Sequence, residues 1–69
     1  MTDRKALFLI EQLNPVLKKS TSYIRKLEID TDNYYINMFN VWGVLLYQVD
    51  YYGRNILEVT DEIIENALY

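Results

Sequence analysis

The sequence contains no cysteine and no histidine. Without cysteine it can form no disulfide and no thiolate metal site, and without histidine it lacks the commonest metal ligand and the commonest general base. Its serine and threonine hydroxyl groups have no imidazole to activate them for nucleophilic catalysis. We predict a protein that is not an enzyme, with no catalytic residues, no metal site and no cofactor.

Glycine and long apolar runs are also scarce. Neither Gly43 nor Gly53 belongs to a glycine-rich phosphate loop, so nothing supports nucleotide binding. The most apolar stretch, Val41–Val49, is about half of the roughly 20 residues that a membrane span needs. With no export signal recognised, we expect a cytoplasmic protein without a membrane partner. Abundant Asn, Ile and Tyr suggest an AT-rich genome, such as that of a phage or other mobile element.

The chain of 69 residues is expected to form a single small domain spanning 1–69. A chain of this size buries only about 60% of the surface that its unfolded form exposes, so its core is marginal. Apolar residues make up 51% of the sequence, which favours folding over disorder. Because disulfides and metals are excluded, a partner subunit is the remaining source of stability, and we predict a homodimer.

Apolar residues follow one another at steps of three and four through the first part of the chain, as in the face of a helix. The stripe consists of Ala6, Ile10, Leu13, Leu17, Ser20, Ile24 and Leu27. It predicts a helix over residues 3 to 28. Pro15 lies inside this segment and should either kink the helix or end it, with Asn14 capping a second helix.

A second stripe predicts a helix from about 32 to 52. It consists of Tyr35, Met38, Trp42, Leu45, Val49, Tyr52 and Ile56. Thr60 followed by two acidic residues predicts a short helix from about 60 to 68. The favoured fold is therefore all-α, an antiparallel helical hairpin plus a short C-terminal helix. Its leftover apolar sides should join two copies into a bundle.

The alternative is an α+β fold, because Tyr, Val, Ile, Phe and Trp all prefer strands. It has a three- or four-stranded antiparallel meander between two helices. The strands would be 23–29, 34–39, 44–49 and 56–59, joined at 30–32, 40–43 and 51–55. This arrangement needs a turn containing Val41 and Trp42, which are not turn residues, so the helical interpretation is preferred.

The charges are unevenly distributed along the chain. Residues 1–27 carry a net charge of +4 and residues 28–69 a net charge of −7, within a total of −3. A basic strip on the first helix could contact phosphates; it comprises Lys18, Lys19, Ser22, Arg25 and Lys26. The strip supports a nucleic-acid-binding regulator as an alternative function, although the acidic total argues against it.

The favoured function is a small protein–protein interaction module, an adaptor, regulator or inhibitor that occupies a partner protein's surface. The reason is the apolar surplus, since aromatic side chains left exposed after folding usually mark an interface. The predicted aromatic anchors are Phe8, Trp42, Tyr47 and Tyr51, and the acidic residues that should steer a basic partner are Glu58, Asp61, Glu62 and Glu65. The sequence identifies no particular partner. A structural subunit of a larger assembly is a further alternative.

Overall fold

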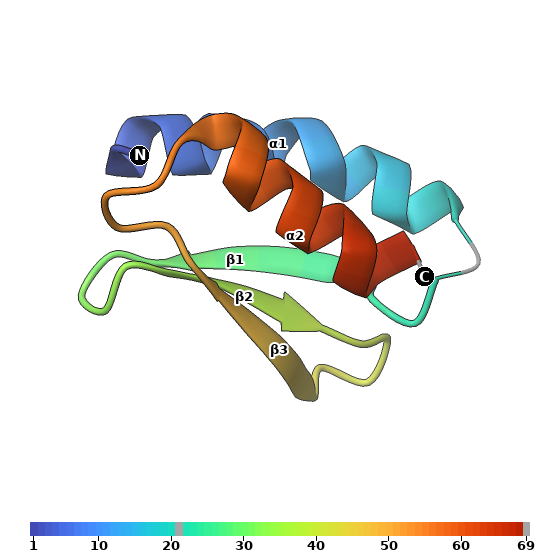
Figure 1. Ribbon diagram of the computed structural model, residues 1–69. Helices are drawn as coiled ribbons and strands as arrows, with labels where there is room; N and C mark the ends of the chain where they lie inside the picture. Colours follow the sequence, from blue (N-terminus) through green and yellow to red (C-terminus); the bar gives the residue numbers. More distant parts are fainter. Residues whose placement is uncertain (21, 69) are drawn as a thin grey trace.

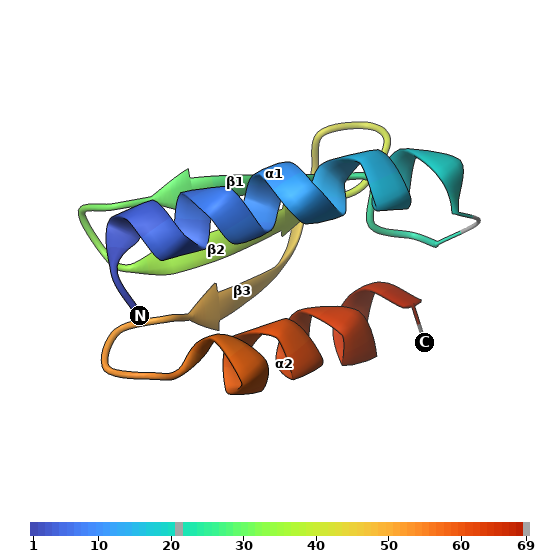
Figure 2. The ribbon, with the colours of Figure 1, turned by 90° about the horizontal axis from the view of Figure 1, so that it is seen from above.

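The computed structural model describes residues 1–20 and 22–68, and these residues form two helices and three strands. The order is α1 (Asp3–Lys19), β1 (Lys26–Asp30), β2 (Tyr35–Phe39), β3 (Leu45–Asp50) and α2 (Ile56–Leu68). Both helices lie on the same face of the sheet (Figures 1 and 2). The predicted all-α fold is wrong, and the α+β alternative describes the chain correctly.

The three strands form an antiparallel sheet in the order β1-β2-β3. Ile36 in the central strand lies opposite Ile29 on one side and Val49 on the other. Side chains on adjoining strands therefore share a face, and alternate residues of β2, Ile36 and Met38, are fully buried. In the described residues, no helix covers the opposite face (Figure 1).

A single hydrophobic core fills the space between the helix layer and the sheet. It comprises Ala6, Leu9, Ile10 and Leu17 from α1, Ile24, Leu27, Ile36, Met38, Val49 and Tyr51 from the sheet and its flanks, and Val59, Ile63 and Ala67 from α2. α1 packs mainly against β1, and α2 against β3. The core thus depends on all five elements.

Helix α1 runs without a break through Pro15 and ends at Lys19, nine residues before the predicted end. Thr2 caps its start, accepting the backbone N–H of Lys5 at 3.2 Å. Ile24 and Leu27 continue the helical spacing and are buried as expected, but Ile24 precedes β1 and Leu27 lies in it. The first stripe therefore predicts burial correctly and secondary structure only in part.

The second predicted helix does not exist, because its stripe combined residues from separate strands and turns. Met38 and Val49 are buried in β2 and β3, whereas Trp42 and Tyr52 are exposed in turns. The alternative's first three strands are confirmed within a few residues, and its fourth, 56–59, is wrong because α2 begins there. The part of the chain that the structure describes contains no helical hairpin that could form the predicted bundle.

Helix α2 begins at Ile56, four residues before the predicted start, because Asn55 rather than Thr60 caps it. The Asn55 side-chain oxygen accepts the backbone N–H of Glu58 at 2.9 Å, and its amide donates to the Glu58 carboxylate at 3.0 Å. Thr60 lies inside the helix, with its hydroxyl donating to the Ile56 carbonyl. In the described residues, neither helix is long and apolar enough to cross a bilayer.

The outer edge of β1 is bonded to a side chain of α1. The Asn14 side-chain oxygen accepts the backbone N–H of Leu27 at 2.8 Å, and its amide donates to the carbonyl of the same residue at 3.2 Å. These are the two bonds that a neighbouring strand would make. Asn14 is therefore not a helix cap, as one interpretation of Pro15 required, but a link between helix and sheet.

Candidate functional site

The turn between β2 and β3, residues 40–44, is held together by one buried side chain. The Asn40 side-chain oxygen accepts the backbone N–H groups of Trp42 at 3.0 Å and Val44 at 2.9 Å. Gly43 adopts the left-handed conformation, with φ of 79°, that glycine tolerates best. The turn is thereby fixed with its tip outward, and the Trp42 side chain is 79% exposed.

Arg25, the residue before β1, is held against the end of α1 by its side chain. The Arg25 guanidinium donates to the backbone carbonyls of Leu17, at 3.3 Å, and Ser20. Carbonyls in the last turn of a helix have no partner within it and carry a partial negative charge, so a cation there is stabilising. Lys18 lies in the same last turn and adds a second positive charge.

The turn at residues 40–44, the end of α1 and the residues around Arg25 line an open cleft of about 860 Å³, which we call the Trp42 cleft. It is lined by Asn14 and Lys18 from α1, Arg25, Lys26 and Glu28 from β1 and its approach, Phe39 from β2, and Asn40, Val41, Trp42 and Gly43 from the turn. Three cations thus face one carboxylate, Glu28, which pairs with Lys26 at 2.9 Å. The cleft combines positive charge with aromatic surface.

The predicted basic strip is divided by the fold. Lys18, Arg25 and Lys26 line the Trp42 cleft, whereas Lys19 is exposed on α1 outside its lining. Ser22 is half-buried, and its hydroxyl accepts the backbone N–H of Ile24 at 3.1 Å. We predicted these residues on one helix. In the structure, Lys18 lies at the end of α1, whereas Arg25 lies just before β1 and Lys26 lies in it.

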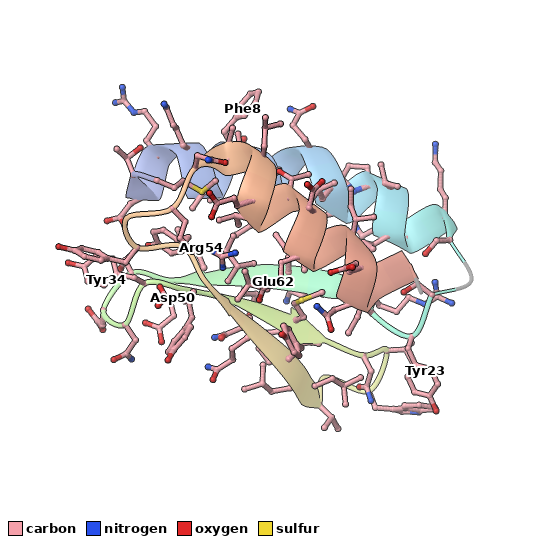
Figure 3. All side chains as sticks on the ribbon, in the orientation of Figure 1. Phe8, Tyr23, Tyr34, Asp50, Arg54 and Glu62 are labelled. Atoms are coloured by element: carbon pink, nitrogen blue, oxygen red, sulfur yellow. The ribbon has the colours of Figure 1, made fainter. Side chains whose placement is uncertain are left out.

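The predicted aromatic anchors do not gather on one surface. Phe8 is exposed on α1 and points away from the sheet (Figure 3). Trp42 lies at the cleft, and Tyr47 lies in β3 with its hydroxyl 3.4 Å from the Glu62 carboxylate. Figure 3 also places Tyr23, which is exposed, at the end of the molecule that carries the β2–β3 turn.

Tyr51 belongs to the core, not to the surface. It is fully buried, and its hydroxyl donates to the Asp3 carboxylate at 2.6 Å. Burial, together with the hydrogen bond to Asp3 and its negative charge, raises the pKa of the Tyr51 phenol well above its usual value. Tyr51 therefore links the end of the sheet to the start of α1.

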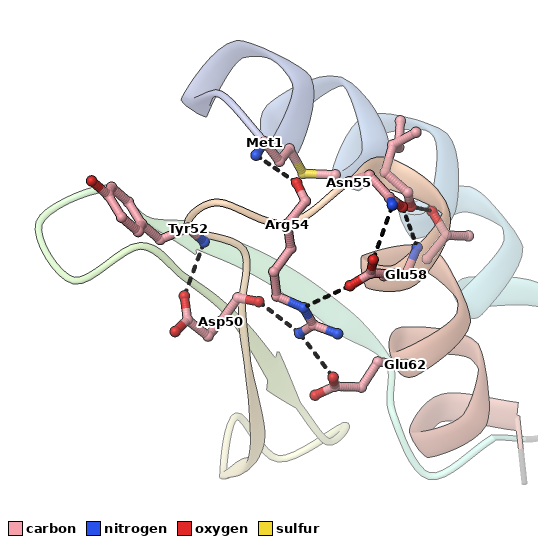
Figure 4. Close-up of polar contacts among 9 residues, drawn as sticks. Met1, Asp50, Tyr52, Arg54, Asn55, Glu58 and Glu62 are labelled. Atoms are coloured by element: carbon pink, nitrogen blue, oxygen red, sulfur yellow. Dashed lines mark hydrogen bonds and ion pairs between the residues drawn. The ribbon is translucent and has the colours of Figure 1, made fainter.

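The predicted acidic residues fall into two groups. Glu58 and Glu62 pair with Arg54 at 3.7 and 2.9 Å, and these contacts, led by the hydrogen bond that Arg54 donates to the Glu62 carboxylate, raise the pKa of Arg54 (Figure 4). Arg54 also donates to the backbone carbonyl of Asp50 at 2.9 Å. Asp61 and Glu65 line a separate open hollow on α2 with Ile64 and Asn66.

Six of the ten residues that line the cleft were not selected from the sequence, and Asn14, Phe39 and Asn40 are the most important of them for the site. Asn14 was considered only as a helix cap, and Phe39 and Asn40 fall inside the helix predicted from about 32 to 52. The sequence did carry one signal for the turn, since an Asn followed three residues later by Gly is typical of turns stabilised by a side chain. The helical pattern across the same residues concealed it.

Comparison of the chain with protein-family models, with curated proteins and with solved structures gives no match. Its function has to be inferred from its own side chains.

Proposed function

We propose that the protein binds single-stranded nucleic acid in the Trp42 cleft. The observation that supports this proposal best is the combination of Phe39 and an exposed Trp42 with Lys18, Arg25 and Lys26 around one cleft. Proteins that bind single strands use the same two components, aromatic rings on which bases stack and cations beside the phosphates.

An exposed indole on a turn whose backbone is fixed favours a single strand over a duplex. Bases within a duplex are stacked on one another and offer no free face to an aromatic ring, whereas the bases of a single strand do. Because Asn40 already fixes the turn, little conformational entropy is lost when a base stacks on Trp42. The cleft, moreover, is small and carries few cations, unlike a long duplex-binding surface.

The acidic remainder of the molecule restricts where a strand can bind. The net charge is −3, yet the cleft lining has more cations than carboxylates. Phosphates are therefore attracted to the cleft and repelled by α2, where the acidic residues outnumber Arg54. Affinity should be modest, and its logarithm should fall with the logarithm of salt concentration with a slope of about −1 to −2, for two or three neutralised phosphates.

Fluorescence provides a direct test, because Trp42 is the only tryptophan in the chain. Titration with a short oligothymidylate at low salt should quench the indole emission, and a duplex of equal length should quench it less. In fluorescence anisotropy with a labelled strand, Trp42→Ala should weaken binding by about tenfold, since stacking of one base contributes 1–3 kcal/mol.

Charge variants complete the test. Lys18→Ala and Lys26→Ala should each weaken binding and flatten its dependence on salt. Lys5→Ala is the matched control, because Lys5 is an exposed lysine of the same helix, near its other end and outside the cleft lining. If no binding occurs at low salt, or if Trp42→Ala binds as well as the unchanged protein, the proposal is wrong.

A second candidate function is binding to a basic surface of a partner protein through the outward face of α2. Leu57, Asp61 and Glu65 follow at steps of four on that face, with Leu57 73% exposed. Leu57 is apolar, and the neighbouring carboxylates of Asp61 and Glu65 are not among those that pair with Arg54. This combination suits an adaptor or inhibitor that contacts a basic surface of another protein. Affinity capture from the source cell should recover a protein partner with the unchanged protein. The triple variant Leu57→Ser, Asp61→Asn, Glu65→Gln should lose this partner and bind oligonucleotides as before.

A further inference from the structure

Several polar side chains that line the Trp42 cleft are already bonded to the protein's own backbone. The Asn14 amide binds both backbone groups of Leu27, and the Asn40 side-chain oxygen accepts two N–H groups of its own turn. The Arg25 guanidinium donates to two backbone carbonyls at the end of α1. The other charged side chains of the lining, which can turn to a ligand, are those of Lys18, Lys26 and Glu28.

Glu28 is the acceptor among these three side chains. A lysine ammonium only donates hydrogen bonds, whereas a carboxylate accepts them at two oxygens, each with two lone pairs. One Glu28 oxygen lies 2.9 Å from the Lys26 ammonium, and the two side chains are 50% and 62% exposed. The carboxylate therefore keeps acceptor sites open to a ligand, while its partner Lys26 reduces its repulsion of nearby phosphates.

The pairing of β1 with β2 places Glu28 beside the aromatic surface of the cleft. Lys26 lies opposite Phe39, and their neighbours Leu27 and Met38 are buried beneath the helices. Because side chains alternate along a strand, Lys26, Glu28 and Phe39 share the uncovered face of the sheet, and Glu28 follows Lys26 by about 7 Å. A base stacked on the rings of the cleft can thus present an edge to Glu28.

The bases differ in what they offer to a carboxylate. Guanine carries two adjacent donors on its Watson–Crick edge, N1–H and N2–H, which match the two oxygens of a carboxylate as a bidentate pair. In cytosine and adenine the amino group lies beside a ring nitrogen that is itself an acceptor. In thymine and uracil a single N–H lies between two carbonyl oxygens. Guanine is therefore the base that engages both carboxylate oxygens.

We propose that Glu28 selects guanine in the Trp42 cleft by accepting hydrogen bonds from N1–H and N2–H of the bound base. This inference rests on the proposed binding of single strands and adds the base that they carry at the cleft. In a duplex the same edge of guanine is occupied by cytosine, so only an unpaired base can present it. A bidentate pair should favour guanine by about tenfold over the other bases.

Fluorescence anisotropy with short labelled oligothymidylates tests the preference, with guanine, adenine or hypoxanthine at one central position. A single guanine per strand keeps the strands from associating with one another. Adenine is the matched control for stacking, because it is also a purine. The guanine strand should bind about tenfold more tightly than the adenine strand. Hypoxanthine lacks only the N2 amino group of guanine, and its strand should be intermediate.

One carboxylate variant assigns the preference to its residue. Glu28→Gln should bring the guanine strand to the affinity of the adenine strand, because an amide offers one acceptor oxygen in place of two. It should not weaken binding of the adenine strand, since it removes a negative charge. Glu11→Gln is the matched control, because Glu11 is an exposed carboxylate of α1 outside the cleft lining, and it should leave the preference unchanged.

The possible results separate this inference from the proposed function. Strands that bind equally well whatever the central base would refute the role of Glu28 and leave single-strand binding intact. A guanine preference that persists in Glu28→Gln would do the same, as would a hypoxanthine strand that binds as tightly as the guanine strand. The last comparison uses the unchanged protein and does not depend on the variant folding. Absence of binding by every strand would overturn both proposals.

Discussion

Asn14 is the residue on which the arrangement of helix and sheet depends most directly. Its side-chain amide binds the N–H and the C=O of Leu27, so one side chain takes the place of a neighbouring strand. Leu27 is only 1% exposed, and water cannot easily replace these bonds. A buried backbone group left without a partner costs about 1–3 kcal/mol, which makes this residue a sensitive point of the fold.

We expect Asn14→Ala to lower the free energy of unfolding by about 2–4 kcal/mol, because it leaves both backbone groups of Leu27 unpaired. Chemical denaturation followed by circular dichroism measures the loss. Asn14→Asp is the informative comparison. At neutral pH its carboxylate can accept the Leu27 N–H but cannot donate to the carbonyl, so its stability should be intermediate. At acidic pH, where the carboxyl group is protonated and can donate, its stability should approach that of the unchanged protein at the same pH. Equal stability of Asn14→Ala and the unchanged protein would contradict this role.

Asn40 has a comparable role in the turn that carries Trp42. Asparagine side chains that accept backbone N–H groups two and four residues later allow a turn to contain residues that would not form one alone. This is why Val41 and Trp42, which are poor turn residues, occupy the tip. The objection that counted against the α+β alternative is thus answered by one neighbouring side chain.

At the scale of the elements, Pro15 lies inside α1 without ending it. Proline has no N–H for the Glu11 carbonyl four residues earlier, and its ring crowds that carbonyl. The helix persists because Leu9, Ile10 and Leu17, on both sides of the proline, are held in the same core. Tertiary packing here outweighs a local penalty.

We expect Pro15→Ala to raise the free energy of unfolding by about 2 kcal/mol. The restored backbone bond and the relieved crowding contribute about 3 kcal/mol, and the extra freedom of the unfolded chain offsets part of this gain. Thermal unfolding of the two proteins, with Val16→Ala as a nearby exposed control, measures the difference. A destabilised Pro15→Ala variant would mean that the proline is required by the native helix.

The sequence identified the helical ends of the chain better than its middle. The spacing over residues 3 to 19 matches the period of a helix, and α1 and α2 both lie where the sequence predicts amphipathic helices. In the middle, strands of five or six residues are too short for their alternation to stand out. Apolar residues of β2, of β3 and of the turn between them, such as Met38, Leu45 and Trp42, happen to follow one another at steps of three and four.

The candidate site could be predicted only in part, for a related reason. Lys18, Arg25, Lys26 and Trp42 were all selected from the sequence, but for two different surfaces. Their proximity depends on the antiparallel pairing of β1 with β2, which brings Lys26 opposite Phe39 next to the turn. Pairing between distant segments is a tertiary property, and no local spacing encodes it.

At the scale of the whole molecule, the buried Tyr51 phenol joins distant parts of the chain by its bond to Asp3. Its pKa is raised in the folded state, mainly by burial and then by Asp3. The unfolded chain releases this proton near pH 10 while the folded chain keeps it. The contribution of the protonated Tyr51 phenol to the free energy of unfolding is therefore complete below about pH 10. It is lost as the pH rises from there towards the pKa of Tyr51 in the folded protein.

We expect the free energy of unfolding to fall more steeply with pH above 10 in the unchanged protein than in Tyr51→Phe, by about 1.4 kcal/mol for each pH unit. Near neutral pH the variant should be about 1 kcal/mol less stable, since it loses a hydrogen bond to a carboxylate that water can still solvate. Urea denaturation at several pH values provides both numbers, with Tyr23→Phe, which is exposed, as the control. Parallel curves for Tyr51→Phe and the unchanged protein would refute this assignment.

The self-contained turn between β2 and β3 also bears on how this protein can change over time. Its shape is set by Asn40 and Gly43, whereas Val41 and Trp42 extend into solvent and take no part in the core. Substitutions at those two tip positions should therefore change the surface of the cleft at almost no cost in stability. The turn is accordingly a natural starting point for selecting new ligands on an otherwise unchanged scaffold.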